Sequence, residues 1–154
     1  MYTETGALSS KAASIIMSLL YIPFVTACNY FDISSESLGI LAILLVIDYM
    51  TGIAKTYVIN KEDIRSYRAI AGILAKISVL LVPITLAVAA KQINYDLSAF
   101  VDTVISMLVL AEVYSIIGNI RVIQTGKPVH EIDAVSFVLA KISNIILELL
   151  RKGR

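Results

Sequence analysis

The sequence predicts an all-α integral membrane protein with four transmembrane helices, both termini in the cytoplasm, and an amphipathic helix at the carboxyl end. The 154-residue chain is 58% hydrophobic and only 16% charged, with a mean hydropathy of +0.83. A soluble domain keeps about a quarter of its residues charged. Uncharged stretches also recur at the length that crosses a bilayer. Basic residues gather in alternate connecting segments, which is typical of a multi-spanning protein.

Composition excludes several classes of function. The net charge of +1 and pI of about 7.8 argue against a nucleic-acid partner. The single cysteine, Cys28, excludes an internal disulfide framework and a cysteine-based metal site. We find no nucleophile–base set, no metal-ligand spacing and no glycine-rich phosphate loop. The sequence therefore predicts a protein that is not an enzyme and has no cofactor and no metal.

The first expected span covers residues 12–31, after a short cytoplasmic segment at 1–11, and it contains Pro23. Its uncharged length suits a bilayer of about 30 Å. Val25 to Cys28 also resembles a bacterial lipobox, so Cys28 could be lipidated after removal of residues 1–27. A secretory apolar region is usually shorter than this one. We favour a retained helix with Cys28 as an inert buried thiol.

Three more spans complete an expected four-helix transmembrane unit over residues 12–128; they are placed at 37–54, 69–90 and 97–120. Each contains an ionisable residue far from its ends: Asp48, Lys76 and Glu112 respectively. The connecting segments set the orientation. If the amino terminus is cytoplasmic, Lys91 is the only basic residue of a connecting segment that lies outside. This asymmetry fits the positive-inside rule for four spans with both ends in the cytoplasm.

The carboxyl-terminal region, residues 129–154, is expected to form a cytoplasmic amphipathic helix with a basic tail. Its apolar residues follow an alternating spacing of three and four that forms a seam: Val135, Val138, Ile142, Ile145 and Leu149. Lys141 and Glu148 make a fifth span improbable. Two interpretations stay open for this helix. It lies on the inner leaflet with its basic end near anionic lipid, or it self-associates through the seam.

The three ionisable residues within the spans are expected at one depth. Counted from the basic residues at the cytoplasmic boundary, Asp48, Lys76 and Glu112 lie about 10, 12 and 13 Å inside. Hydrocarbon demands a partner for each charge, so we expect one cluster with Lys76 between two carboxyl groups. The excess of one acid suggests that one carboxyl group keeps its proton.

Three roles are open for this cluster. It can fix the register of the helices as an internal ion cluster. It can become hydrated and line a pore or its closed precursor. It can also act as a proton relay in a small transporter, although the chain lacks the paired inverted repeats of broken helices that such transporters use.

Eight residues in order carry a family resemblance: Asp48, Thr51, Gly52, Gly72, Lys76, Glu112, Ser115 and Asn119. With their spacing, over about Leu41 to Pro128, the chain resembles the toxin-secretion and phage-lysis holin family (bacteriophage holin family 4). That family commonly has a second acid where this chain has Gly118. The departure removes one charge from the helix that contains Glu112.

The resemblance implies a protein that accumulates in the bacterial cytoplasmic membrane, oligomerises and opens lesions. Those lesions release a cell-wall hydrolase (an endolysin) or a toxin, and an antiholin is a possible further partner. The resemblance also implies that the chain directly contacts membrane lipids and other copies of the same chain. Two alternatives from other classes remain: a non-conducting membrane scaffold or antiholin, and a small proton-coupled transporter.

Overall fold

The computed structural model describes residues 3–59, 66–93, 96–127 and 133–152, with side chains from Ile15 onward except those of residues 16, 20 and 66. The described chain is helical with no strand. Its five helices are α1 (Thr3–Tyr30), α2 (Ser35–Ile59), α3 (Ser66–Gln92), α4 (Ser98–Thr125) and α5 (Ala134–Lys152). The all-α prediction is confirmed for these residues.

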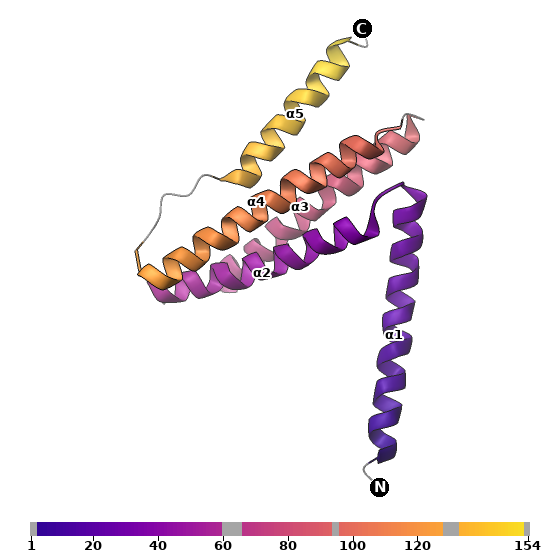
Figure 1. Ribbon diagram of the computed structural model, residues 1–154, viewed down its shortest axis with the longest axis vertical. Coiled ribbons are helices and arrows are strands. Elements are labelled where there is room, and N and C mark those ends of the chain that lie inside the picture. The colour runs from indigo at the N-terminus through magenta and orange to yellow at the C-terminus, as the bar shows by residue number, and fades with distance from the viewer. Residues whose placement is uncertain (1–2, 60–65, 94–95, 128–132, 153–154) are drawn as a thin grey trace.

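Helices α2, α3 and α4 lie side by side and successive helices run in opposite directions (Figure 1). The closest packing is between α2 and α4, and α3 packs less extensively on both. Leu38, Leu41 and Leu45 of α2 are buried, and they repeat at the three- and four-residue spacing of one helix face. They meet buried residues of α4, among them Ile105 and Leu108, in the main apolar core.

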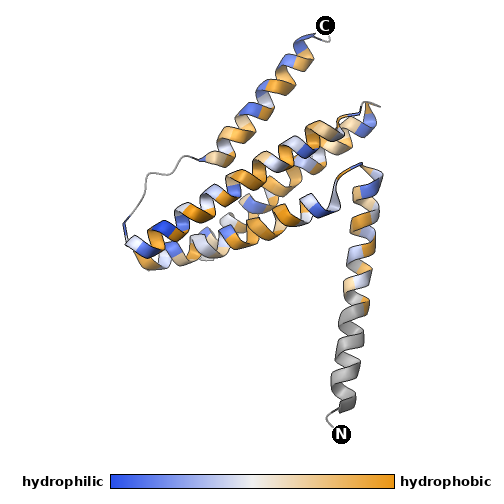
Figure 2. Ribbon diagram, viewed as in Figure 1, coloured by the Kyte–Doolittle hydropathy of each residue, from blue (hydrophilic) through white to orange (hydrophobic). Residues whose placement is uncertain are grey.

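Each of α2, α3 and α4 is long and apolar enough to cross a membrane. Large apolar side chains point outward from all three, and Ile43, Leu74 and Leu110 are 61%, 58% and 68% exposed. Much of the ribbon of these three helices is orange, the colour of hydrophobic residues, in Figure 2. Apolar surface on this scale needs lipid or a partner around it. Three of the expected spans are therefore confirmed as helices that can cross a membrane, and these helices extend beyond the expected spans at most of their ends.

Helix α1 stands apart from the three-helix bundle and contacts α2 only near its end (Figure 1). Cys28 is buried there, whereas Ile15 and Met17 are exposed. Among the described residues, three helices are long and apolar enough to cross a membrane, namely α2, α3 and α4. The fourth expected span, at residues 12–31, is not one of these three.

The turn between α1 and α2 ends α1 with a Schellman-type cap. Asp32 has a positive φ of 54°, and the Ile33 amide donates to the Cys28 carbonyl at 2.9 Å. Lys91 at the end of α3 lies 3.2 Å from the Asp32 carboxylate. This ion pair ties the α1–α2 turn to the neighbouring end of the bundle.

The expected amphipathic helix is present as α5, and residues 129–132, with which the expected region begins, lie outside the described residues. The chain turns at Gly126, whose φ of 65° caps α4, and α5 then runs back along α4 (Figure 1). Val138 and Ile142 are buried in the main apolar core. The helix thus packs on the side of the bundle, because its apolar face finds apolar partners on α4.

Candidate functional site

The buried faces of α2 and α4 carry polar side chains as well as apolar ones. Asp48 lies three residues after Leu45 and therefore on the same face of α2. Glu112 and Asn119 lie seven residues apart on the buried face of α4. Two apolar helices that pack by these faces must therefore bury their polar residues between them.

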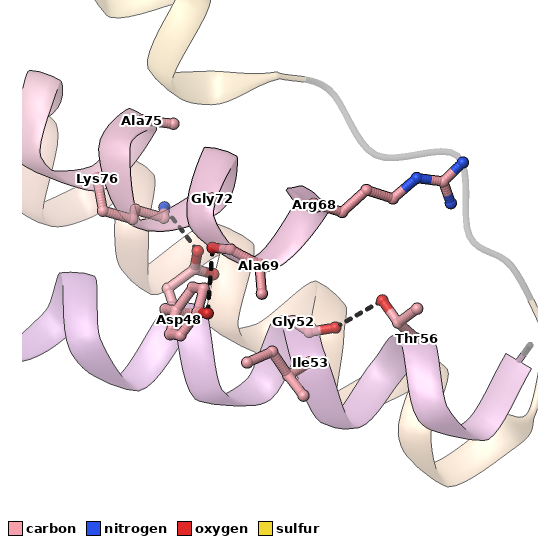
Figure 3. A pocket seen from close by; sticks show the side chains of 10 residues that line it. Asp48, Gly52, Ile53, Thr56, Arg68, Ala69, Gly72, Ala75 and Lys76 are labelled. Carbon is pink, nitrogen blue, oxygen red and sulfur yellow. Dashed lines mark hydrogen bonds and ion pairs between the residues drawn. The ribbon is translucent and has the colours of Figure 1, made fainter. Parts of the chain in front are cut away.

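Asp48, Lys76 and Glu112 lie together in the structure, and we call them the ion triad. Lys76 Nζ is 2.6 Å from Asp48 Oδ2 and 2.7 Å from Glu112 Oε2. The Glu112 side chain is 0% exposed and that of Lys76 is 23% exposed. Figure 3 shows Lys76 reaching from α3 to Asp48 on α2. The triad joins three helices through a single ammonium group.

The second oxygen of Asp48 is also satisfied. Asn119 Nδ2 donates to Asp48 Oδ1 at 3.0 Å and to Thr51 Oγ1 at 3.3 Å. The Thr51 hydroxyl in turn donates to the main-chain carbonyl of Asp48 at 3.0 Å. These bonds fix the Asp48 carboxylate in one orientation between α2 and α4.

Glu112 differs from Asp48, because its Oε1 atom is buried and has no hydrogen-bond partner among the described atoms. The triad also has two carboxyl groups for one ammonium. An uncompensated carboxylate in an apolar interior is expensive. One carboxyl group of the triad therefore has no cation of its own among the described residues.

A groove of about 440 Å³ lies beside the triad between α2 and α3, lined by Asp48, Tyr49, Gly52, Ile53, Thr56, Arg68, Ala69, Gly72, Ala75 and Lys76 (Figure 3). The Tyr49 hydroxyl crosses the groove and donates to the Ala69 carbonyl at 3.2 Å. A Cβ atom at Gly72 would lie 3.2 Å from the Tyr49 ring. Glycine at this position therefore permits the approach of α3 to α2.

The other residues singled out by their spacing lie near the triad in different ways. Thr51 belongs to its hydrogen-bond network, and a Cβ atom at Gly52 would lie 3.8 Å from Asn119 Nδ2. Ser115 is half-buried on α4 and takes no part in the bonds described for this network. The structure thus brings the glycines, Thr51 and Asn119 to the triad and leaves Ser115 aside.

The apolar seam of α5 is only partly free. Val138 and Ile142 are buried, and Val135 packs against the same core. Ile145 is half-buried, and Leu149 is 56% exposed. The first half of the seam therefore packs within this chain.

Charged residues differ between the two ends of the bundle. The end where α2 finishes and α3 begins carries Lys55, Arg68, Arg121 and Lys127. The opposite end carries Asp32, Glu36, Lys91 and Asp96. Two hydrogen bonds from Ser98 lower the pKa of the exposed Asp96 carboxyl group. One end is thus basic and the other mostly acidic.

A comparison with family models matches residues 25–136 to the bacteriophage holin family. The match extends from the last six residues of α1 to the first turn of α5 and contains the whole ion triad. No curated protein and no solved structure matches the chain.

Proposed function

The chain belongs to the bacteriophage holin family, and we propose that it oligomerises in the bacterial cytoplasmic membrane and opens lesions there. A cell-wall hydrolase or a toxin leaves the cell through these lesions. The observation that carries this proposal is the family match over most of the chain, including all three helices fit to cross a membrane. The copies of the chain and the surrounding lipid are its direct partners, and an endolysin or toxin is the cargo.

The proposed topology has four spans with both termini in the cytoplasm before lesions open. The basic end of the bundle faces the cytoplasm, which the positive-inside rule favours. Helix α1 crosses as the fourth span and places the amino terminus on the same side. The mostly acidic end, with Asp32 and Asp96, then faces outward.

We propose that the ion triad is a clasp that holds α2, α3 and α4 in register. Lys76 is the one cationic group between Asp48 and Glu112, so it couples α3 to the close α2–α4 pair. Each of the three side chains thereby has a charged partner, which an ionisable group needs in the membrane interior. The clasp keeps the bundle intact while copies assemble through their lipid-facing surfaces.

The test is to induce the full-length chain in bacteria and follow the passage of a folded reporter protein across the cytoplasmic membrane. The proposal expects abrupt release after a period in which membrane-inserted protein accumulates. An equal amount of an unrelated multi-spanning protein serves as the control. Retention of the reporter in cells with ample inserted protein would overturn the holin assignment.

An antiholin or non-conducting scaffold is separated by a second measurement. Co-expression with a holin of known timing delays its lysis if the chain is an antiholin. The present proposal expects earlier release or no change. Stable complexes without any permeability would favour the scaffold.

A further inference from the structure

The groove between α2 and α3 is large enough to hold a ligand. Its volume of about 440 Å³ lies in the range of small-molecule sites. Helix α3 also packs less extensively on α2 than α4 does. The groove has room because several residues of its walls have small side chains: Gly52, Ala69, Gly72 and Ala75.

The chemistry of the groove changes along its length. Arg68 and Thr56 line it at the basic end of the bundle. Asp48 and Lys76 line it at the inner end, where their charges compensate each other at a distance of 2.6 Å. Small and apolar residues, among them Ile53, line the part between these ends. The groove therefore has a cationic mouth and a largely apolar course.

The depth of the groove matches one leaflet of a bilayer. Arg68 and Lys76 are eight residues apart on α3, which corresponds to about 12 Å along the helix. Half of the hydrocarbon thickness of a membrane is about 15 Å. Figure 3 shows Arg68 extending away from Lys76, toward the side on which Thr56 lies. Long basic side chains near helix ends reach the lipid headgroups in this way.

The charge at the mouth of the groove favours an anionic headgroup. Lys55, Arg121 and Lys127 lie at the same end of the bundle as Arg68. A guanidinium group presents its donors in a fork that matches the oxygens of a phosphate. Basic pockets between membrane-crossing helices on the cytoplasmic side are typical sites for anionic phospholipids.

We infer, with the membrane location and orientation of the proposed function as the premise, that the α2–α3 groove binds one anionic phospholipid of the cytoplasmic leaflet. The lipid phosphate contacts Arg68, and one acyl chain lies along Ile53 and Gly72 toward Lys76. The acyl chain fills the space beside the ion triad. The bound lipid therefore stabilises the packing of α3 on α2, and its binding does not require that lesions open.

The site is tested by fluorescence, because the chain contains no tryptophan and a single introduced one reports on its own surroundings. Ile53→Trp probes the groove. Met50→Trp is the matched control, since Met50 is exposed three residues away on α2 and does not line the groove. The full-length chain is placed in phosphatidylcholine vesicles that contain a small fraction of either phosphatidylglycerol or phosphatidylcholine with brominated acyl chains, which quench tryptophan.

We expect the quenching of Ile53→Trp to show binding about fivefold tighter for anionic phosphatidylglycerol than for zwitterionic phosphatidylcholine. This ratio corresponds to about 1 kcal/mol, the attraction of one basic residue to an anionic lipid surface. The quenching of Met50→Trp should differ less than about twofold between the two lipids, because ordinary lipid contacts discriminate weakly.

Two pairs of variants in the Ile53→Trp chain separate the headgroup from the acyl chain. Arg68→Gln should abolish the preference for phosphatidylglycerol. Arg121→Gln removes the same charge from the same end, outside the groove, and should keep the preference. Ala75→Leu narrows the groove and should reduce quenching by both lipids. Ala71→Leu, at an exposed position of α3 that does not line the groove, should not.

Thermal unfolding of the chain without tryptophan provides an independent measurement. Phosphatidylglycerol added to the protein in detergent should raise the unfolding temperature more than phosphatidylcholine does, because a ligand that binds the folded state stabilises it. The difference should disappear in Arg68→Gln and persist in Arg121→Gln. Equal shifts for the two lipids in the unaltered chain would contradict an anionic lipid site.

The other occupants of the groove give different results. Equal quenching of Ile53→Trp by the two lipids indicates ordinary surrounding lipid and overturns this inference. Quenching of Met50→Trp but not of Ile53→Trp indicates water or a second copy in the groove and also overturns it. The reporter-release assay is separate. Release with equal quenching leaves the holin function without this site, and retention of the reporter with selective quenching leaves the site without the holin function.

Discussion

Asp48 is tolerated within an apolar helix because every one of its polar contacts is supplied by another helix or by its own. Lys76 neutralises one carboxylate oxygen, and Asn119 donates to the other. Lys76 also serves Glu112, so the triad depends on this single ammonium more than on either acid. Loss of the cation leaves two buried carboxyl groups facing each other.

This dependence predicts unequal effects of neutral substitutions. Lys76→Met should destabilise the full chain by about 3–5 kcal/mol, which is the cost of removing one partner of a buried ion pair. Asp48→Asn or Glu112→Gln should cost less, because one acid still balances Lys76. The measurement is thermal unfolding of the purified protein in detergent.

The matched control is Lys91→Met, which removes an exposed ion pair with Asp32 worth about 0–1 kcal/mol. Neutralising both acids in the Lys76→Met chain should recover much of the lost stability. Equal unfolding temperatures for Lys76→Met and Lys91→Met would contradict the role of the triad as a clasp.

Two glycines give a second residue-level prediction. A Cβ atom at Gly72 would lie 3.2 Å from the Tyr49 ring, whereas one at Gly39 would have no atom within 4 Å. Alanine in a helix interior gains up to about 1 kcal/mol over glycine. Gly39→Ala should therefore raise the unfolding temperature, and Gly72→Ala should lower it or leave it unchanged. The opposite order would show that α2 and α3 do not approach each other at Gly72.

Counting residues from the basic boundary was enough to place Asp48, Lys76 and Glu112 in one layer, because helices rise regularly. The same count could not show that Glu112 Oε1 lacks a partner, since that depends on rotamers and on the tilt of α3. It also gave no sign that Ala134 and Val138 of α5 lie beside Ala111 of α4. That proximity depends on the return of α5 along α4.

At the scale of elements, α5 shows what an apolar pattern can and cannot predict. The spacing of Val135, Val138 and Ile142 identified which face of the helix is apolar. It could not identify the surface that covers this face, because lipid, a second copy and α4 are all apolar. The structure places α4 there for Val138 and Ile142.

The first turn of α5 depends on Asp133, which accepts from the Ser136 amide at 3.0 Å and from its hydroxyl at 2.6 Å. Asp133→Ala should cost about 1 kcal/mol of helix stability, as for other lost caps. Because these bonds lower the pKa of Asp133 in the folded chain, their contribution is present above the ordinary aspartate pKa and is lost as pH falls through the folded value. Hydrogen exchange at the Ser136 and Phe137 amides measures both effects.

Asp133→Asn is the control for this prediction. Asparagine caps a helix about as well as aspartate but does not titrate. The variant should keep the protection of the first turn at neutral pH and lose the acid-dependent part. Unchanged protection in Asp133→Ala at neutral pH would show that the cap does not hold the start of α5.

At the scale of the whole molecule, the two ends of the bundle differ in charge, and this difference predicts orientation. In a Cys28→Ser background, Ile93→Cys lies at the mostly acidic end and Lys127→Cys at the basic end. An impermeant thiol reagent added to intact cells before release should label Ile93→Cys and spare Lys127→Cys. Labelling of Lys127→Cys alone would reverse the proposed orientation.

Hydropathy predicted the membrane class and the spans of α2, α3 and α4 because both depend on local composition. The arrangement of these helices depends on packing and was not accessible in this way. Packing between helices determines the close α2–α4 pair, the looser α3 and the outward direction of α1. The fourth span at residues 12–31 stays a prediction for the same reason.

Release of a folded protein from liposomes by the purified full-length chain tests the central claim most directly. Vesicles of bacterial lipid carry a small dye and a folded fluorescent protein together. Loss of the dye alone indicates a small opening, and loss of both cargoes indicates a large one. We predict that both cargoes leave the same vesicles, and only above a threshold of protein per vesicle, because the opening requires assembly. Loss of the dye with retention of the folded protein at every protein density would contradict the proposed holin function.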